Sequence, residues 1–359
     1  MSALPPGGAI GILGGGQLGR MTAIAAARLG YRVHIFDPDR DAPASAVAAT
    51  TTHADYADQA AIASFAATID VATYEFENIA HEGVAALAAL KPVRPGPEVL
   101  RIAQDRLLEK DFVNQAGIAT ARYVEVAGAA SLMRAARDLG FPAVLKSVRM
   151  GYDGKGQAMI RADSDPEALW MQLGAPRGVV ETFVDFACEI SVIVARGLDG
   201  QTLSYVPVEN QHKNHILDTT IAPARIASEI AMKAEAIARH IAEKLELVGL
   251  LAVEMFVTRD GQVLVNELAP RPHNSGHWTI DACLTSQFEQ LVRAICGWPL
   301  GSPERHSDAI MKNLIGEEVN DWPEIVKDPA AKLHLYGKRE IRPGRKMGHV
   351  TRLSPRADR

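Results

Sequence analysis

The sequence predicts a mixed α/β and α+β protein built from three consecutive regions. In the first region, a glycine-rich loop joins a short apolar strand to a helix, an order typical of a parallel βαβ sheet. In the second, strands and helices alternate around another glycine-rich loop. In the third, two β-rich runs flank an Asp-Gly pair, a strong signal for an antiparallel hairpin. We place the three regions at residues 1–103, 104–184 and 185–359.

The first region contains the loop Gly14–Gly19, whose sequence fits the G-x-G-x-x-G pattern. We expect a strand at residues 9–13 before it and a helix at residues 20–29 after it. The glycines permit a tight turn, and a helix N-terminus favours a phosphate group. Asp37 stands near the usual position of a ribose-binding acid. This loop alone leaves three alternatives open: NAD, another phosphorylated ligand, or a purely structural turn.

In the second region we expect one helix over residues 97–115 and a strand that carries Lys146. Five residues later begins the loop Gly151–Gln157. A strand lysine at this spacing can reach two phosphates of a nucleotide, while a glycine-rich backbone wraps around the phosphate oxygens. The loop is not a Walker A motif, because no Gly-Lys-Ser/Thr opens a helix. The alternative is a plain hairpin turn with a surface lysine.

The third region contains the expected hairpin. If Asp260 and Gly261 are its two turn residues, Glu254 lies directly opposite Glu267. Opposite residues of an antiparallel pair share a face, with Cβ atoms roughly 4.5–5.5 Å apart. Facing carboxylates repel unless a cation or a shared proton joins them. Mg²⁺ suits such a pair because it accepts carboxylates together with substrate phosphates. The alternative is a solvent-facing hairpin with two screened glutamates.

Polar chemistry is densest at residues 266–277, directly after the second strand of this hairpin. An apolar strand rarely runs into a carboxylate, a guanidinium, two imidazoles and two amides, and this density predicts an active site. We have no role for His277. His212 follows a strand in a polar run, and Lys338, Arg339, Arg342, Arg345 and Lys346 form a basic cluster that is either a solvated face or a site for a phosphorylated substrate.

Composition restricts the class of protein. The 359 residues are 47% hydrophobic and 23% charged, as expected for a globular protein of two or three domains. A net charge of −5 argues against binding to nucleic acid or to a membrane surface. Three cysteines without metal-ligand spacing indicate thiols in a reducing compartment. We expect neither a signal peptide nor a transmembrane span.

Four motifs occur together in order: Gly14–Met21, Tyr74–Asn78, Gly151–Gln157 and Asn266–His277. With them the chain resembles the ATP-grasp superfamily, and within it the 5-(carboxyamino)imidazole ribonucleotide synthases of purine biosynthesis. The resemblance runs from about residue 14 to about residue 350. It implies the ATP-grasp fold, with an N-terminal Rossmann-like (pre-ATP-grasp) domain, a small lid subdomain, and a C-terminal α+β catalytic domain that ends in the basic segment.

The resemblance implies an ATP site. The residues it assigns to ATP are Arg106, Lys146, Gly151, Tyr152, Asp153, Gly154, Lys155, Gly156, Gln157, Glu181, Thr182, Phe183, Val184, Glu189, His212, Asn266 and Glu267. Arg106 and Lys146 would contact phosphates, Glu181–Val184 would bond adenine through the backbone, and Glu189 would bind the ribose. Glu254 and Glu267 would hold Mg²⁺, or Mn²⁺ in its place. A strict hairpin turns Asn266 away from Glu267, so its role requires a bulge or a strand end.

The resemblance also implies a site for the second substrate. The residues it assigns there are Gly16, Gln17, Leu18, Glu77, Asn78, Tyr152, Asp153, Arg271, His273, Asn274, Lys338 and Arg345. The last two would bind a 5′-phosphate, and the glycine loop would serve the ribonucleotide rather than NAD. The expected catalytic residues are Arg271, His273, Asp153 and Lys155.

The implied activity has two steps. Bicarbonate attacks ATP to give carboxyphosphate and ADP, and 5-aminoimidazole ribonucleotide then takes up the carboxyl group or released CO₂. The implied enzyme is a cytoplasmic homodimer that binds neither nucleic acid nor membrane. Three alternatives stay open: a related ATP-grasp enzyme, such as a formate-dependent ribonucleotide formyltransferase or a biotin carboxylase; an NAD-dependent oxidoreductase; and a non-catalytic nucleotide sensor.

Overall fold

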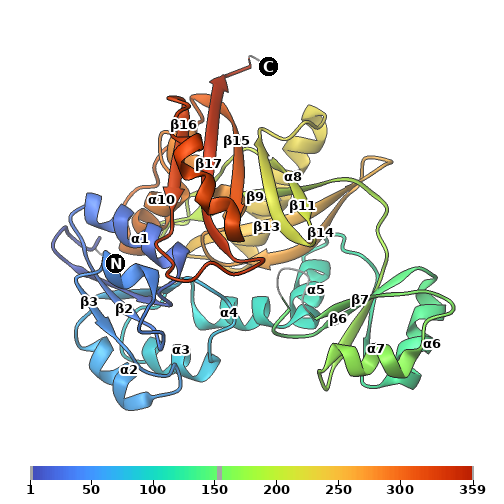
Figure 1. The fold of residues 1–359 in the computed structure, drawn as a ribbon. Helices are drawn as coiled ribbons and strands as arrows, with labels where there is room; N and C mark the ends of the chain where they lie inside the picture. Colours follow the sequence, from blue (N-terminus) through green and yellow to red (C-terminus); the bar gives the residue numbers. More distant parts are fainter. Residues whose placement is uncertain (1–2, 152–155, 358–359) are drawn as a thin grey trace.

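The computed structural model describes residues 3–151 and 156–357, and its strands form three sheets. Figure 1 shows the N-terminal region at the left, a smaller green region at the right, and the large C-terminal region above both. Four expected site residues, Tyr152, Asp153, Gly154 and Lys155, lie outside the described residues.

The N-terminal sheet is parallel with the order β3-β2-β1-β4, as the βαβ pattern predicts. All five residues of β1 are buried, as expected for a strand covered on both faces. The helix after the glycine loop begins at Gln17, three residues before the expected start. The elements are β1 (Ala9–Leu13), α1 (Gln17–Arg28), β2 (Arg32–Phe36), η1 (Pro43–Ala46), β3 (Thr50–Thr52), α2 (Gln59–Ala66), β4 (Val71–Tyr74) and α3 (His81–Ala88).

Two helices, α4 (Pro97–Gln104) and α5 (Arg106–Gln115), lead from the first region to the second. The expectation of one helix over residues 97–115 is therefore wrong. The chain breaks at Asp105, whose backbone is extended and whose carboxylate accepts hydrogen bonds from Leu107 N and Leu108 N. Asp105 is thus a helix N-cap, and the break makes Arg106 the first residue of a new helix.

The second sheet is antiparallel with the order β5-β8-β6-β7, and it packs against two helices. Lys146 lies on β6 beside the strand that follows the second glycine-rich loop, because Lys146 pairs with Gln157. The elements are β5 (Tyr123–Val126), α6 (Ala129–Leu139), β6 (Ala143–Ser147), β7 (Gln157–Ile160), α7 (Pro166–Leu173) and β8 (Gly178–Thr182).

The third sheet has nine strands in the order β14-β13-β9-β11-β12-β15-β17-β16, with β10 added to β9. The polar run around His212 is itself a strand of this sheet, β11. The elements are β9 (Phe186–Arg196), β10 (Thr202–Ser204), β11 (Val208–Lys213), β12 (Ile216–Ala222), α8 (Ser228–Lys244), β13 (Gly249–Thr258), β14 (Val263–Ala269), η2 (Asn274–Gly276), α9 (Thr279–Ala282), α10 (Gln287–Cys296), β15 (Ser307–Ile315), η3 (Gly316–Asp321), α11 (Trp322–Ile325), β16 (Ala331–Leu335) and β17 (Lys346–Pro355).

Apolar packing on both faces of β13 fixes which way its side chains point. Leu250 and Ala252 join a core that includes residues of α1 and α10, whereas Leu251 and Val253 join a core that includes residues of α8. Since side chains alternate along a strand, Glu254 continues the face of Leu250 and Ala252. That face meets the N-terminal region, so Glu254 lies where the large sheet and the first region come together.

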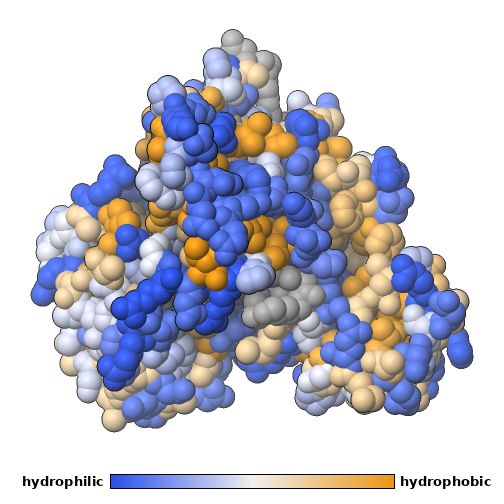
Figure 2. All heavy atoms as spheres, viewed as in Figure 1, coloured by the Kyte–Doolittle hydropathy of each residue, from blue (hydrophilic) through white to orange (hydrophobic). Residues whose placement is uncertain are grey.

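Within the described residues, no helix combines the length and the apolar character needed to cross a membrane. Figure 2 shows that hydrophilic side chains predominate at the centre of the viewed face, above the hollow between the two lower lobes.

Candidate active site between the three regions

The β13–β14 hairpin has a different turn from the one predicted. Thr258 N donates to Gln262 O at 2.9 Å, so three residues connect the strands instead of two. Gly261 takes the left-handed conformation, with φ +80°, that such a loop requires. The Asp-Gly signal located the turn correctly but did not give its length, because both loop types place glycine at a positive φ.

The pairing of Glu254 with Glu267 is nevertheless confirmed. A three-residue turn by itself would place Glu254 opposite Asn266. The register shifts by one residue between Glu254 and Met255, so Asn266 is an extra residue that bulges from β14. A role for Asn266 beside Glu267 required a bulge or a strand end, and this bulge supplies it. Asn266 Oδ1 lies 3.2 Å from Lys146 Nζ.

Each glutamate of the pair has a nitrogen partner from another segment. Glu254 Oε1 lies 2.9 Å from His273 Nε2, and Glu267 Oε2 lies 3.1 Å from Arg106 Nη1. Burial raises the pKa of Glu254, but His273, His212 and Arg271 together outweigh burial and bring the pKa below its usual range. Glu254 is therefore an ionised carboxylate at neutral pH, which is the form that binds a cation.

A buried carboxylate holds two lysines beside this pair. Glu181 Oε2 lies 2.9 Å from Lys146 Nζ, and Glu181 Oε1 lies 3.2 Å from Lys110 Nζ. Burial raises the pKa of Glu181, but Lys146 and Lys110 outweigh it and lower the pKa to about 2. The Glu181 side chain thus positions a lysine expected to bind phosphate, a role that the sequence reading did not include.

Arg271 is held by a carboxylate from the N-terminal region. Its Nε and Nη2 donate to the two oxygens of Glu77, the second at 3.0 Å. Burial lowers the pKa of Arg271, but Glu77 outweighs it and raises the pKa. A planar guanidinium paired bidentately with a carboxylate has a fixed orientation. The pair therefore ties the polar stretch after β14 to the motif after β4.

The first glycine loop binds carboxylates of its own chain. Gly16 N and Gly19 N donate to Glu75, and Gly15 N donates to Asp37 Oδ2 at 2.5 Å. In a dinucleotide-binding protein the helix N-terminus holds the pyrophosphate and the acid holds the ribose. Here Glu75 and Asp37 bind the loop instead, so this geometry disfavours the NAD alternative.

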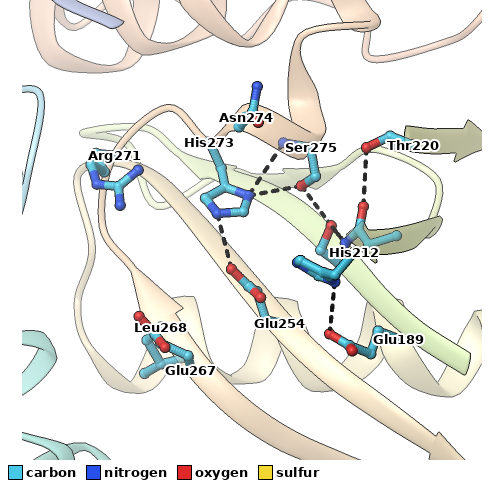
Figure 3. Close-up of polar contacts among 12 residues, drawn as sticks. Glu189, His212, Thr220, Glu254, Glu267, Leu268, Arg271, His273, Asn274 and Ser275 are labelled. Carbon is cyan, nitrogen blue, oxygen red and sulfur yellow. Dashed lines mark hydrogen bonds and ion pairs between the residues drawn. The ribbon is translucent and has the colours of Figure 1, made fainter. Parts of the chain in front are cut away.

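His212 and Glu189 form a further pair across two neighbouring strands. His212 Nδ1 lies 3.2 Å from Glu189 Oε2. Burial lowers the pKa of His212, but the Glu189 carboxylate outweighs burial and raises it. Figure 3 shows this pair on the same side of the sheet as Glu254 and His273. The residue expected to bind ribose therefore has a histidine partner that restricts its rotation.

One cavity of about 910 Å³ brings most of the predicted residues together. Its lining comes from the second and third sheets, from α5, and in the first region from α1 and the segment after β4. The predicted residues that line it are Gln17, Leu18, Glu77, Asn78, Arg106, Lys146, Gly156, Gln157, Glu181, Thr182, Phe183, Val184, Glu189, His212, Glu254, Asn266, Glu267, Arg271, His273 and Asn274.

Some predicted residues do not line this cavity. Gly16 lies in the glycine loop behind Gln17, and Gly151 precedes the part of the lid loop that is outside the described residues. Lys338 and Arg345 lie in the segment between β16 and β17. There Lys338 Nζ donates to Lys346 O at 2.7 Å, and Arg345 Nη1 donates to Glu340 O at 3.0 Å. Their phosphate-binding role stays a prediction.

Several cavity residues were absent from the predicted site. Glu75 and Phe76 belong to a motif that the sequence had singled out, and Lys346 belongs to the basic cluster. Phe186 and Phe256 form a stacked pair in the wall, with ring centroids 4.9 Å apart. Their separation of 70 residues along the chain gave no signal, because cross-strand neighbours become visible only once β9 and β13 are paired.

His277, for which the sequence suggested no role, lies outside the cavity lining. It is fully buried and packs against Phe288, Tyr336 and His349. Gln287 Nε2 lies 3.1 Å from its Nδ1. His277 therefore belongs to the buried core and not to the cavity.

The donor chemistry fits a hard divalent cation. No described residues form a group of three or more His, Cys, Asp or Glu side chains suited to a metal. Two opposed carboxylates, Glu254 and Glu267, fit Mg²⁺ only if a ligand supplies the remaining oxygens, as nucleotide phosphates do. Lys146 and Arg106 lie beside them and would neutralise such phosphates.

Three family models match the chain in succession. Residues 8–104 match the ribonucleotide synthetase preATP-grasp domain, and residues 111–288 match the ATP-grasp domain. Residues 309–359 match the phosphoribosylaminoimidazole carboxylase C-terminal domain. The ATP-grasp fold with an N-terminal pre-ATP-grasp domain, expected from the sequence, is thereby confirmed.

Two curated relatives align over nearly all of the chain. The N5-carboxyaminoimidazole ribonucleotide synthase of Brucella melitensis is 46% identical over 357 residues, covering 99% of each protein. A bifunctional purine synthesis protein (purC/E) of Dictyostelium discoideum is 48% identical over 370 residues, covering 97% of this chain. The chain spans only 37% of the length of that second relative.

Solved structures agree with these relatives. The ADP complex of an N5-carboxyaminoimidazole ribonucleotide synthetase superposes with a TM-score of 0.95 at 44% identity, covering 99% of this chain and 94% of the other. An N5-carboxyaminoimidazole synthase from Aspergillus clavatus, in complex with ADP and 5-aminoimidazole ribonucleotide, gives a TM-score of 0.91 at 32% identity, covering 97% of this chain and 94% of the other. The chain therefore belongs to the N5-carboxyaminoimidazole ribonucleotide synthase family of ATP-grasp ligases.

Proposed function

We propose that this chain carboxylates the amino group of 5-aminoimidazole ribonucleotide, using ATP and bicarbonate, as a step of purine biosynthesis. The observation that carries the proposal is the shared cavity. Paired glutamates and Lys146 lie at one part of it, and Arg271, His273 and Asn274 lie on the segment that directly follows. The complex of a relative with ADP and 5-aminoimidazole ribonucleotide supports the same pair of ligands.

In the first step, an oxygen of bicarbonate attacks the γ-phosphorus of ATP, and ADP leaves. Phosphoryl transfer depends mainly on positioning and on neutralisation of charge. Lys146, held by Glu181 and Asn266, and Arg106, held by Glu267, would place positive charge beside the phosphates. Glu254 and Glu267 would hold Mg²⁺, which when bound would supply charge neutralisation for the phosphates.

In the second step, the exocyclic amine attacks the carboxyl carbon of carboxyphosphate, or CO₂ released from it. The amine loses a proton and inorganic phosphate leaves. Arg271 suits the anion because a guanidinium binds carboxylate-like groups in a fixed orientation, which Glu77 sets here. Because carboxyphosphate hydrolyses readily, the cavity must exclude water while it is present.

The remaining expectations stay proposals for this chain: a homodimer, a cytoplasmic location, bicarbonate as the carboxyl source, and Mg²⁺ as the cation. The subdivision at residues 103/104 and 184/185 also stays a prediction. The catalytic roles of Asp153 and Lys155 concern residues outside the described part of the chain.

The deciding experiment measures release of ADP and phosphate with ATP and bicarbonate, with and without 5-aminoimidazole ribonucleotide. We expect the ribonucleotide to yield its N-carboxylated product, detected by mass spectrometry with ¹³C-bicarbonate. Replacement of bicarbonate by formate is the control, since a formyltransferase would accept formate. Formylated product, or absence of labelled product together with ADP release, would contradict the proposal.

A further inference from the structure

The side chain of Gln104 joins two segments that are far apart along the chain. Gln104 is the last residue of α4, which runs from the N-terminal region toward the second region (Figure 1). Its Nε2 donates to Glu77 O and to Ile79 O, each at 2.6 Å. Its Oε1 accepts from Arg149 Nη2 at 2.7 Å. Both the nitrogen and the oxygen of the Gln104 amide are therefore engaged.

The partners of this amide fix its orientation. Carbonyl oxygens only accept hydrogen bonds and a guanidinium only donates them, so the NH₂ group of Gln104 must face the two carbonyls and its oxygen must face Arg149. Gln104 is 6% exposed and lies outside the cavity lining. Its side chain therefore acts on neighbouring residues and not on a ligand in the cavity.

The segment that Gln104 binds carries a residue of the proposed active site. Residues 75–80 lie between β4 and α3 and belong to neither a helix nor a strand. A backbone carbonyl removed from water needs a partner, and Gln104 supplies one to Glu77 and one to Ile79. The Glu77 carboxylate in turn holds Arg271 through two hydrogen bonds. A shift of the backbone at Glu77 would therefore move the Arg271 guanidinium.

The other partner of Gln104 belongs to the nucleotide side of the cavity. Arg149 follows Lys146 by three residues, in the segment after β6. A second hydrogen bond connects the same two places, because Arg106 N donates to Val148 O at 3.0 Å. The junction of α4 and α5 is thus bound to the segment after β6 and, through Gln104, to the segment after β4.

We propose that Gln104 is a positioning residue that holds Glu77, and through it Arg271, in a fixed position relative to the strand of Lys146. In the proposed function the nucleotide and the acceptor occupy different parts of one cavity. Carboxyphosphate formed at the first part must meet the acceptor before water hydrolyses it to bicarbonate and phosphate. The kinetic consequence rests on the proposed function, whereas the placement of the segment after β4 does not.

Gln104→Met tests the proposal, because methionine has a similar size but no amide. We expect kcat/KM for the ribonucleotide to fall about 10- to 100-fold, since a misplacement of about 1 Å can cost about 100-fold. KM for ATP should change by less than about twofold. ADP released per carboxylated product should rise at least about twofold, because more carboxyphosphate is lost to water. An equal effect on ATP, or an unchanged ratio of ADP to product, overturns the proposal.

Gln115→Met is the matched control. Gln115 is the last residue of α5, as Gln104 is of α4, but it is exposed. This variant should keep the kinetic constants and the ratio of ADP to product of the wild type. A loss equal to that of Gln104→Met would show that any such glutamine has the effect, and would overturn the specific role of Gln104.

A double-mutant cycle tests whether Gln104 acts through Glu77. If it does, Gln104→Met should add less than about twofold to the loss of kcat/KM that Glu77→Gln causes alone. Two residues that act independently would instead multiply their effects. A multiplied loss in the double variant would therefore contradict the proposal, as a purely structural role of Gln104 would also predict.

Gln104→Glu keeps the test decisive if the methionine variant does not fold. It preserves the shape of the side chain and the contact with Arg149, but a carboxylate cannot donate to Glu77 O or Ile79 O. We expect the same fall in kcat/KM for the ribonucleotide and the same rise in ADP per product. Wild-type kinetics in folded Gln104→Glu would overturn the proposal.

Hydrogen exchange of the full chain, followed by mass spectrometry, tests the placement without an activity assay. We expect peptides that cover residues 75–80 to exchange faster in Gln104→Met than in the wild type and in Gln115→Met, while peptides of α8 stay unchanged. Unchanged exchange at residues 75–80 overturns the proposal. If the wild-type enzyme forms no labelled product, the proposed function fails instead, and the exchange result still decides the role of Gln104.

Discussion

The position of Glu267 depends on a single extra residue in β14. Because side chains alternate along a strand, a one-residue shift would turn Glu267 away from Glu254. The three-residue turn introduces such a shift, and the bulge at Asn266 removes it. Asn266 at the same time reaches Lys146. One backbone irregularity thus places two side chains at the proposed nucleotide site.

Glu267→Gln tests the cation site at this residue. The amide keeps the shape of the side chain but removes its charge, so we expect turnover to fall by more than about 100-fold, since loss of a ligand should exceed the ~10–100-fold effect of outer-shell partners. The melting temperature should stay close to that of the wild type. ADP release at several Mg²⁺ concentrations measures the effect, with the exposed Glu243→Gln as control. Near-normal turnover would exclude Glu267 as a ligand.

The sequence predicts the partner of a site residue only when the two residues lie close together along the chain. The Glu254–Glu267 pair could be counted from the turn, because register in a hairpin is a local property. The pairing of Arg271 with Glu77 spans 194 residues, and no local rule predicts it. Ser191 and Ser275, whose hydroxyl oxygens lie 2.6 Å apart, are similarly remote, and a serine hydroxyl gives no functional signal until its burial and partners are known.

At the scale of elements, one face of α5 connects the small sheet to the large one. Arg106, Glu109 and Lys110 are three and four residues apart, so they lie on the same side of the helix. Arg106 pairs with Glu267, Glu109 Oε2 accepts from Leu268 N at 3.1 Å, and Lys110 pairs with Glu181. Ionisable residues on a buried helix face are uncommon, and here they fix α5 against β14 and β8.

Lys110→Met tests this helix face. Lys110 is 1% exposed, and its loss leaves Glu181 paired with Lys146 alone. We expect Lys146 to be held more tightly by Glu181 and to contact phosphate less well, with KM for ATP raised about fivefold and stability reduced by roughly 3 kcal/mol. Steady-state kinetics and urea unfolding measure the two effects. Exposed Lys233→Met on α8 is the control, and equal behaviour of the two variants would contradict this role.

The segment between β16 and β17 carries the two residues predicted to bind the 5′-phosphate. If Arg345 does so, Arg345→Ala should raise KM for the ribonucleotide by about 10-fold, since a charge-assisted bond contributes roughly 1.5–3 kcal/mol, and should leave KM for ATP nearly unchanged. Initial rates with each substrate varied in turn measure this. Arg342→Ala is the control, because exposed Arg342 pairs with Glu340. Equal effects on both substrates would place the phosphate elsewhere.

Sequence patterns predicted most elements, and the failures have local causes. The single expected helix at residues 97–115 broke at Asp105, because a capping carboxylate competes for the first N–H groups of the next helix. β11 was not predicted as a strand because Glu209, Asn210 and His212 interrupt its apolar character. Asn210 and His212 contact Ser191 and Glu189 of β9, and Glu209 pairs with Arg225 in the segment after β12. Only the assembled fold reveals these contacts.

At the scale of the whole molecule, all three regions contribute residues to one cavity, while a separate buried cluster contains His277 and His349. His277 and His349 are fully buried with ring centroids 4.9 Å apart, and Tyr336 Oη lies 2.9 Å from His349 Nδ1. Burial lowers the pKa of both histidines well below 6.5. Both rings are therefore neutral in the folded protein.

This burial predicts loss of stability in acid. Below pH 6.5 the unfolded chain binds protons that the folded chain excludes, so each histidine lowers the free energy of unfolding by roughly 1.4 kcal/mol per pH unit as the pH falls. Glu109 acts in the opposite sense, because burial and Glu267 raise its pKa to about 8. His349→Gln isolates the histidine, since Glu109 is common to both proteins.

Urea unfolding between pH 7.5 and pH 5.5 measures this dependence. We expect His349→Gln to lose less stability than the wild type over that interval, because glutamine takes up no proton. Exposed His306→Gln should follow the wild type. Parallel curves for His349→Gln and the wild type would show that His349 does not resist protonation.

The exposed tip of the β13–β14 hairpin is a place where the chain could be cleaved between the two paired glutamates. Arg259 is exposed at the tip, whereas β14 is held along its length, by Glu109 at Leu268 and through Val265 N, which donates to Ala119 O at 2.9 Å. Cleavage after Arg259, as by trypsin, would put Glu254 and Glu267 on different polypeptides without removing any contact that aligns them. We expect the two fragments to stay associated and to form one site in which neither fragment alone holds both carboxylates.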